Sequence, residues 1–470
     1  MKFLHSISVG SLPDMIEVTK DCRTIIAVIE GEPYMQGNQL VDPLGGVTLI
    51  RFSSTDLSGQ YQTKRLDFSG FSAAEYEARG VRFIYKENGN TFARDLEPEY
   101  VTLNEDETIA YICIQENNAI ATVDISNFNT ARITELYPLG YADWSQSTLD
   151  ASDRDNSINM KSWDVYGMYQ PDTIKYFKLN NQPYLVTMNE GDAKDYDSWS
   201  EEMRGQDFLL NNMVDDDAVD PVFKDNLAVV TALGRLKFST ASGKTPGSEK
   251  YSSFYAFGSR GFSFRSATDM SLVWDSTNAM ETVMKNNMAN IFNANANDGK
   301  DPVVSTFDKR SDDKGPETEA GDVGTIGSDT VFFIGNERTG TIAIYSVKHD
   351  LTNPVFHSIN YGGNLTMSDS WEYQYNVRRI GDMDPEDIKF ISARDSPLLG
   401  QDLLVVTGAV SGTLAVYAVI DDDGTGTADP MDVLLRKLFD NGDGDSDEFI
   451  SKMEFRTFIV GSADLNGLCV

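Results

Sequence analysis

One unit recurs along this chain and limits the folds that it can adopt. Each copy opens with proline and an acidic residue, runs through a strand-like segment and a turn of Asp, Asn or Gly, and continues with two apolar runs separated by a polar step. Short strands with regular turns are typical of sandwiches, barrels and propellers, and an internal repeat favours the propeller. The copies begin at Pro13-Asp14, Pro98-Glu99, Pro171-Asp172, Pro316-Glu317 and Pro385-Glu386.

A sixth unit, without the proline start, lies around residues 254–275. The sequence therefore predicts a mainly β protein, a β-propeller of about six visible blades, or seven in a longer chain. Two insertions, residues 197–227 and the helix-like residues 280–301, are expected on the propeller faces, where function commonly lies. The strand residues predicted to be buried are Ile112, Val123, Leu185, Phe333, Ile344, Val405 and Val416.

Two segments near the C-terminus have the ligand spacing of a 12-residue calcium loop, which supplies oxygens from positions 1, 3, 5, 7, 9 and 12. In residues 421–432 these positions hold Asp421, Asp423, Thr425, Thr427, Asp429 and Asp432. In residues 443–454 they hold Asp443, Asp445, Asp447, Phe449, Ser451 and Glu454. Thr427 and Phe449 would contribute their carbonyl oxygens. Ca²⁺ is thus the predicted bound ion, and these twelve residues are the predicted metal ligands.

The two segments differ at position 6, where the loop turns sharply. Gly426 suits this turn, whereas Glu448 does not, so a longer register beginning at Asp440 stays open for the second segment. Asp429-Pro430 predicts the start of a helix that continues through Phe439. The layout resembles tandem EF-hand and dockerin modules. It predicts a propeller over residues 1–420 and a small α-helical, EF-hand-like calcium module over residues 421–470; the alternative is an acidic tail without a cation.

The amino-acid composition limits the classes of partner that the chain is expected to bind. The 470 residues carry a formal net charge of -34, which disfavours nucleic acid and anionic membranes and favours cations or surfaces that present them. No apolar run is long enough for a transmembrane segment. Cys22 and Cys113 lie in apolar contexts and are expected to be core thiols. The first five residues are too short for a signal peptide, so either the protein is cytosolic or this chain begins inside a longer precursor.

No catalytic residue is predicted, because three histidines cannot supply a histidine metal cluster or a triad. Acidic clusters elsewhere could form a further Ca²⁺ site or, equally, turns and ion pairs. Arg154, Arg310 and Arg338 could hold phosphate beside them, which would suit a calcium-dependent, phytase-like phosphatase. The acidic clusters contain Glu30, Glu32, Asp150, Asp153, Asp155, Glu190, Asp192, Asp308, Asp312, Asp313 and Glu317.

Several longer motifs resemble the choice-of-anchor I domain, the propeller of mesenchyme-specific cell surface glycoproteins. They include residues Asp95–Glu99, Gln115–Ala121, Leu149–Asp155, Met188–Ala193 and Asp308–Glu317, and the resemblance covers roughly residues 4–420. It implies a secreted or surface-anchored propeller, associated in animals with calcium carbonate biomineralization. The chain departs from that family in lacking a secretion signal and an N-terminal blade, and in ending with the calcium loops.

Together these observations predict an acidic, calcium-binding, extracellular or cell-surface propeller protein. Its expected partners are calcium or a calcium mineral surface, and matrix or cell-surface proteins. Its expected role is biomineralization or binding at the matrix and cell surface. A calcium-dependent phosphoric ester hydrolase is the alternative, and a pure protein-interaction platform is a third reading.

Overall fold

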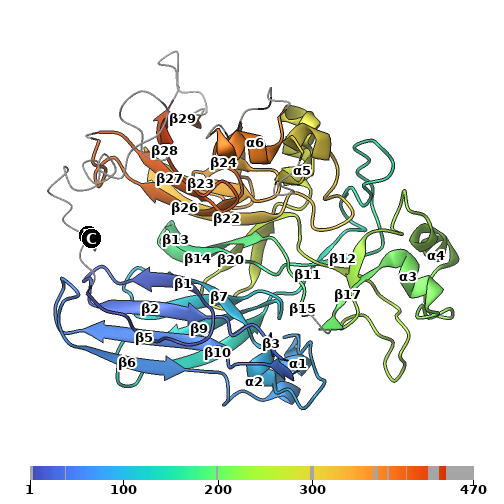
Figure 1. Ribbon diagram of the computed structural model, residues 1–470, viewed down its shortest axis with the longest axis horizontal. Coiled ribbons are helices and arrows are strands. Elements are labelled where there is room, and N and C mark those ends of the chain that lie inside the picture. Colours follow the sequence, from blue (N-terminus) through green and yellow to red (C-terminus); the bar gives the residue numbers. More distant parts are fainter. Residues whose placement is uncertain are drawn as a thin grey trace.

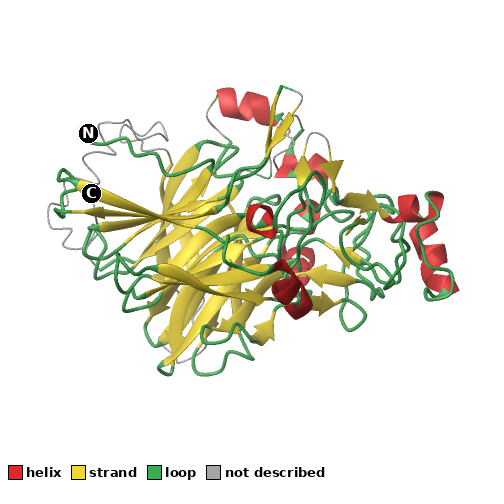
Figure 2. Cartoon of the chain, turned by 90° about the horizontal axis from the view of Figure 1, so that it is seen from below, coloured by secondary structure: helices red, strands yellow, loops and turns green. Residues whose placement is uncertain are grey.

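The computed structural model describes residues 4–421 and 433–440, apart from residues 38, 197–198, 297–300, 364, 366–368, 378–379 and 399. Strands are the predominant regular secondary structure in this part of the chain (Figure 2). They form five four-stranded antiparallel sheets, here called sheets 1 to 5 in chain order. Figure 1 places sheet 3 in the middle, with sheets 1 and 2 below it and sheets 4 and 5 above it.

The strands of each sheet follow one another from one edge to the other. Sheet 1 contains β1 (Pro13–Val18), β2 (Thr24–Ile29), β5 (Gly46–Phe52) and β6 (Tyr61–Leu66). Sheet 2 contains β7 (Pro98–Leu103), β8 (Ile109–Ile114), β9 (Ala119–Asp124) and β10 (Arg132–Pro138). Sheet 3 contains β13 (Ile174–Leu179), β14 (Gln182–Asn189), β20 (Gly261–Ser266) and β21 (Leu272–Asp275). Sheet 4 contains β22 (Thr318–Ile326), β23 (Asp329–Asn336), β24 (Thr341–Val347) and β25 (Val355–Tyr361). Sheet 5 contains β26 (Pro385–Ile391), β27 (Leu403–Gly408), β28 (Thr413–Asp421) and β29 (Val433–Asp440).

Smaller elements decorate these sheets. The short strands are β3 (Tyr34–Gln36), β4 (Gln39–Val41), β11 (Tyr141–Asp143), β12 (Tyr166–Met168), β15 (Asp195–Tyr196), β16 (Trp199–Ser200), β17 (Glu202–Arg204), β18 (Lys237–Ser239) and β19 (Tyr255–Ala256). The helices are α1 (Ala73–Arg79), α2 (Phe92–Asp95), α3 (Gly205–Leu210), α4 (Pro221–Ala228), α5 (Ala279–Asn287) and α6 (Trp371–Asn376), with 3₁₀ turns at Ala289–Ile291 and Val303–Thr306. Within the described part of the chain, none of the helices has the length and apolar character needed to span a bilayer.

Successive sheets pack face to face. Their first strands contact in order, β1 with β7, β7 with β13, β13 with β22 and β22 with β26. An apolar cluster fills each of these four junctions, and aromatic residues of β20 and β23 are prominent between sheets 3 and 4. Burial of such apolar surface, at about 25 cal/mol per Å², is the main force that holds the sheets together.

The predicted core is largely confirmed. Five of its residues are fully buried and Val416 is 3% exposed. Val405 is only half-buried. Its neighbours Leu404 and Val406 face the cluster shared with sheet 4, and successive side chains of a strand point to opposite faces.

The predicted sixth unit is not a separate sheet. Residues 254–275 contribute β20 and β21, which extend sheet 3 because β20 pairs with β14 along its length. Residues 190–260 intervene in the sequence and carry α3 and α4, which lie at the right of Figure 1. A long insertion separates the second and third strands of sheet 3. For this reason the two halves of that sheet were predicted from the sequence as two separate units. The five proline-acid dipeptides correspond to five sheets: they open β1, β7 and β26, and lie just before β13 and β22.

The helix expected from Pro430 through Phe439 is wrong over its described residues. Residues Val433–Asp440 form β29, which pairs antiparallel with β28 in the register Asp421↔Val433 and Val419↔Leu435. The free edge of β28 supplies hydrogen-bond partners for a whole strand, and tertiary pairing of this kind overrides local helix propensity.

The expectation for the cysteines is half right. Cys113 is a fully buried free thiol. Cys22 is not a core thiol: it lies in the turn between β1 and β2, with a φ angle of 54°, and is disulfide-bonded. Its partner is not among the described residues.

Candidate cation-binding site

Acidic residues gather at one end of the sheets because of strand register. In an antiparallel pair, the start of the first strand lies beside the end of the second. The pairs that open sheets 1, 2, 4 and 5 are Pro13↔Ile29, Pro98↔Ile114, Thr318↔Asn336 and Pro385↔Gly408. Acidic residues follow the second strand of four sheets directly or after one residue, namely Glu30, Glu116, Glu190 and Glu337.

A bulge interrupts the first strand just after each of these opening pairs. The register shifts after Pro13, Pro98, Thr318 and Pro385. Bulges re-aim side chains and are frequent beside functional sites. The acidic residues at the four bulges are Asp14, Glu99, Glu319 and Glu386.

A glycine directly after two of the acids makes the chain turn away from them. Gly31 and Gly191 have φ angles of 79° and 88°, in the left-handed region that glycine tolerates best. At Gly191 a Cβ atom would lie 2.0 Å from the backbone nitrogen of Gly258, so no side chain fits there. The Glu-Gly pairs thus hold Glu30 and Glu190 at tight loops at the sheet ends.

These acids surround a cavity of about 490 Å³. It receives residues from sheets 1, 2 and 4 and from the insertion between β14 and β20. Its acidic lining residues are Glu30, Glu32, Glu97, Glu99, Glu116, Asp192, Asp195, Glu202 and Asp313. Its cationic lining residues are Lys194, Lys237, Arg310, Lys314 and Arg338.

Beside this cavity, three buried carboxylates converge on one point. Glu190, Glu319 and Glu337 each offer an oxygen, and these oxygens lie within 4.8 Å of one another. The Oε2 atoms of Glu319 and Glu337 are buried without a hydrogen-bond partner. Glu190 is held in place, since its oxygens accept from Gln115 Nε2 at 2.8 Å and from Lys314 Nζ at 2.6 Å. An unpartnered buried carboxylate is costly, and a cation among the three oxygens would remove that cost.

The electrostatics of the three carboxylates agree with this geometry. Burial, followed by the charge of Glu337, raises the pKa of Glu319 well above its usual range. Burial, followed by the charge of Glu317, does the same for the pKa of Glu337. Burial and mutual repulsion thus disfavour the ionised forms of Glu319 and Glu337 when no cation is bound. Their oxygens are hard donors of the kind that Ca²⁺ prefers, and neither His nor Cys belongs to this group.

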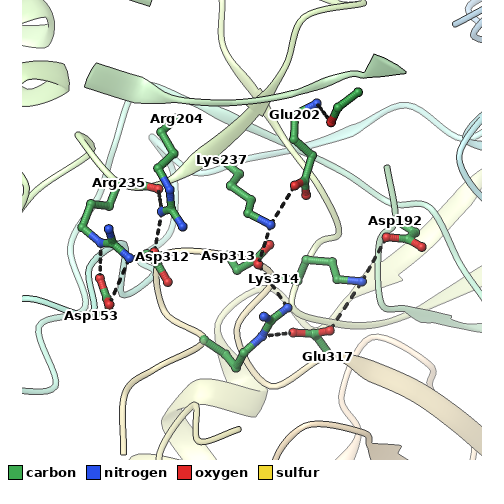
Figure 3. A network of polar contacts seen from close by, with 12 residues as sticks. Asp153, Asp192, Glu202, Arg204, Arg235, Lys237, Asp312, Asp313, Lys314 and Glu317 are labelled. Atoms are coloured by element: carbon green, nitrogen blue, oxygen red, sulfur yellow. Dashed lines mark hydrogen bonds and ion pairs between the residues drawn. The ribbon is translucent and has the colours of Figure 1, made fainter. Parts of the chain in front are cut away.

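The cations of the cavity are engaged with other acids. Arg310, Lys314 and Arg338 all reach Glu317, at 2.5, 3.4 and 2.9 Å. Although burial opposes the shift, these three cations hold the pKa of Glu317 well below its usual range. Figure 3 shows Lys314 lying between Glu317 and Asp192.

The acidic residues singled out from the sequence fall into two groups, those that form ion pairs and those that belong to the carboxylate group or line its cavity. Asp153 and Asp312 form ion pairs with Arg235, while Asp313 is paired with Lys237 and Arg310. Glu190 belongs to the carboxylate group, whereas Glu30, Glu32 and Asp192 line its cavity. Arg154 lies apart from the cavity lining and contacts Asp153.

Sequence reasoning missed Glu319 and Glu337 as site residues. The signal for Glu337 was its place after the second strand of a repeat, shared with Glu116 and Glu190. Glu319 was masked by Pro316-Glu317, because the proline-acid pair of sheet 4 precedes the strand, and Glu319 occupies the bulge position. Of the twelve predicted calcium-loop ligands, all but Asp421 lie outside the described residues, and Asp421 is the last residue of β28.

Comparison with known proteins identifies a matching family model and related sequences. The family model for the choice-of-anchor I domain matches residues 1–350. A mesenchyme-specific cell surface glycoprotein of Strongylocentrotus purpuratus is 30% identical over 394 residues, covering 79% of this chain. Gigasin-3a of Magallana gigas is 36% identical over 187 residues, covering 40% of this chain. The chain spans 45% and 64% of the lengths of these two relatives.

Solved structures resemble the chain only distantly. The periplasmic gluconolactonase PpgL of Pseudomonas aeruginosa has 11% sequence identity and a TM-score of 0.33, with 91% of this chain and 85% of that chain covered. A putative 6-phosphogluconolactonase of Bacteroides fragilis has 9% identity and a TM-score of 0.32, with 91% and 83% covered. Scores this low assign neither a fold nor an activity.

Proposed function

This chain belongs to the choice-of-anchor I domain family, and from that premise we propose that it is an extracellular or cell-surface protein that binds Ca²⁺. The name of the sea urchin relative, a cell surface glycoprotein, supports the location. So does the disulfide bond of Cys22, because disulfides persist in oxidising compartments and are rare in the cytosol.

We further propose that sheets 1 to 5 are the blades of a β-propeller. Their first strands would surround the central channel, with the carboxylate group at one end. A second cavity, of about 730 Å³, supports this arrangement because all five first strands line it. They contribute Glu17 from β1, Thr102 from β7, Lys175 from β13, Asp322 from β22 and Lys389 from β26.

The observation that carries calcium binding is the convergence of Glu190, Glu319 and Glu337, together with the buried Oε2 atoms of Glu319 and Glu337 that lack a hydrogen-bond partner. Ca²⁺ takes six to eight oxygen ligands in flexible geometry, so three carboxylates leave positions for water or for an external ligand. The acidic cavity beside them offers a route for ions from solvent. Mg²⁺ suits this site less well, because it demands near-ideal octahedral geometry and sheds water reluctantly.

Glu319→Gln tests this site. The substitution preserves size but removes a charge, so we expect calcium affinity at the site to fall by at least about tenfold, or ~1.4 kcal/mol. Calorimetric titration of the full chain with micromolar to millimolar Ca²⁺ should then show one fewer bound ion for the variant than for the wild type. Glu249→Gln is the matched control, since Glu249 has a 91% exposed side chain and should titrate as the wild type does. Identical titrations of Glu319→Gln and wild type would remove the site.

Calcium binding by the two C-terminal loops is a separate proposal from the site formed by Glu190, Glu319 and Glu337. Because Asp421 pairs with Val433, residues 422–432 connect two adjacent strands of sheet 5, and residues 443–454 follow β29. Ligand spacing in both segments supports additional bound Ca²⁺.

We extend the proposal to mineral or matrix surfaces that present calcium. A net charge of -34 over the chain favours attraction to such surfaces. Biomineralization, expected from the family resemblance, is the role that we propose for this attraction, with matrix or cell-surface proteins as further partners.

A calcium-dependent phosphoric ester hydrolase is the second candidate. The observation in its favour is that Arg310, Lys314 and Arg338 line the same cavity as the acids. Their engagement with Glu317 counts against it, since a phosphate would have to displace that carboxylate.

We therefore expect no turnover of p-nitrophenyl phosphate above background, with or without Ca²⁺. Release of p-nitrophenol by the full chain is the measurement, with Glu319→Gln as the paired variant. Calcium-dependent turnover that disappears in Glu319→Gln would make the hydrolase the better assignment.

A further inference from the structure

Four acids on the wall that sheets 1 and 2 give to the acidic cavity form no ion pair with the residues that the structure describes. Glu30 and Glu32 follow β2, Glu99 lies in β7, and Glu116 follows β8. All four line the cavity of about 490 Å³. This wall therefore offers carboxylates that the described protein leaves without a cation.

The two acids of sheet 2 point most directly to a ligand. Glu99 and Glu116 are 7% and 5% exposed, and the Oε2 atom of each is buried without a hydrogen-bond partner. A buried carboxylate oxygen without a donor is costly. Because both residues line the cavity, a ligand inside it lies next to them.

The cations that line the cavity are already paired with other acids. Moving one of them to Glu99 or Glu116 would strand the acid that it leaves, which is strongly unfavourable in a buried site. The donor that these two acids lack must therefore come from outside the lining. The existing pairs, with nitrogen to oxygen distances of 2.5–2.9 Å, are Lys194 with Glu97, Lys237 with Glu202, Arg310 with Glu317, Lys314 with Glu190 and Arg338 with Glu317.

The electrostatics of the wall agree with this geometry. Burial, followed by the charge of Glu116, raises the pKa of Glu99 well above its usual range. Burial does the same for the pKa of Glu116, although the charge of Lys194 opposes the shift. Burial and the charge of Glu116 also raise the pKa of Glu30 to about 8. A positively charged ligand in the cavity would favour the ionised forms of all three acids.

The spacing of these acids does not suit a single metal ion. Within the described part of the chain, the carboxylate oxygens that converge within 4.8 Å belong to Glu190, Glu319 and Glu337, and none of the four wall acids is among them. A metal ion needs its ligands around one centre. An ammonium group instead donates up to three hydrogen bonds, and several such groups along a flexible chain can reach acids that lie apart.

We propose that this cavity binds a small organic polyammonium ligand, a molecule with two or more amines, through Glu30, Glu99 and Glu116. Glu99 and Glu116 accept from its buried end, and the half-buried Glu30 accepts from the end nearer to solvent. The cavity volume lies in the range of small-molecule sites, about 300–1,000 Å³. This function goes beyond calcium binding at Glu319 and does not depend on it.

Calorimetric titration of the full chain with spermidine, in EDTA and at physiological salt, tests the site. We expect saturable binding of one spermidine per chain, and Glu116→Gln and Glu99→Gln should each weaken it by at least about tenfold. Both substitutions preserve size and remove a repulsive charge, so circular dichroism should show folded proteins. Glu249→Gln is the matched control, because its 91% exposed side chain lies outside the cavity lining.

Diffuse attraction is the competing explanation, since a net charge of -34 draws any polyamine to the surface. Diffuse binding would be weakened equally little by Glu116→Gln and Glu249→Gln, and that result would overturn the site. Pentanediol, an uncharged chain with hydroxyl groups in place of amines, should not bind. Binding of pentanediol as tight as that of spermidine would equally contradict a polyammonium site.

The two ligands separate this inference from the proposed function. Glu319→Gln should lose one bound Ca²⁺ and still bind spermidine, whereas Glu116→Gln should keep that Ca²⁺ and lose spermidine. A wild-type chain that binds Ca²⁺ through Glu319 but does not bind spermidine would overturn the inference and leave the proposed function intact. Spermidine binding in a chain whose calcium titration ignores Glu319→Gln would do the reverse.

Discussion

Arg260→Met is expected to lower the free energy of unfolding by about 3–5 kcal/mol, the usual cost of breaking a buried ion pair from one side. Arg260 and Glu281 approach to 2.7 Å with side chains that are 3% and 0% exposed. Methionine keeps the apolar stem but strands the Glu281 charge. It also leaves the carbonyls of Asp150, Ser311 and Asp313 without their donor.

Urea unfolding followed by circular dichroism measures this loss. Arg394→Met is the control, because Arg394 pairs with Asp395 on the surface and its side chain is 88% exposed. A surface ion pair of this kind contributes about 0–1 kcal/mol. Similar losses in the two variants would mean that Arg260 does not hold the loops together.

Calcium is expected to reverse the pH dependence of stability. The pKa of Glu30 is raised from 4.5 to about 8 by burial and by the charges of Glu116 and Glu32. Glu319 and Glu337 are shifted in the same direction. An acid whose pKa is raised by folding contributes stability that is full below its unfolded pKa and lost as the pH rises through the folded pKa. Without calcium, stability should therefore fall between about pH 4.5 and pH 8.

Bound Ca²⁺ needs the carboxylates of Glu319 and Glu337 in their ionised form, so its stabilising effect should grow as the pH rises. Each site adds about 2.7 kcal/mol when free Ca²⁺ exceeds its dissociation constant about 100-fold. Glu317 and Asp313 have lowered pKa values, so their contribution to the free energy of unfolding is lost only in more acidic solution. It does not change between pH 5 and pH 8.

Thermal unfolding in EDTA and in Ca²⁺, at steps from pH 5 to pH 8, is the measurement. The gap between the two melting temperatures should widen toward pH 8 in the wild type and narrow in Glu319→Gln. An equal gap at every pH would show that the buried acids are not the calcium ligands.

Local pattern was enough to locate the strand units and most of the core. Successive side chains of a strand point to opposite faces, so an apolar run such as Ile109–Ile114 places apolar groups on both faces of its sheet. Ile112 could therefore be assigned to the interior without knowledge of the neighbouring strands. The proline-acid starts likewise marked the five first strands. These features depend on neighbours in the sequence, and the sequence contains them completely.

Strand partners across long gaps were decided by the tertiary structure. The pairing of β14 with β20 spans the insertion of residues 190–260, and no local pattern records which edge a distant strand will join. At Val433–Asp440, the open edge of β28 outweighed a sequence that favours a helix after Asp429-Pro430.

The fate of each acid was likewise decided in three dimensions. Composition alone determined that this chain is acidic and suited to cations, and its family motifs pointed to the same class of protein. Which carboxylates find an arginine, as Glu317 does, and which stay unpartnered, as Glu319 does, depends on strand register and on how sheets pack. Glu317 and Glu319 are two residues apart, yet the bulge in β22 separates their environments. Charge is a property of the residue, whereas its compensation is a property of the fold.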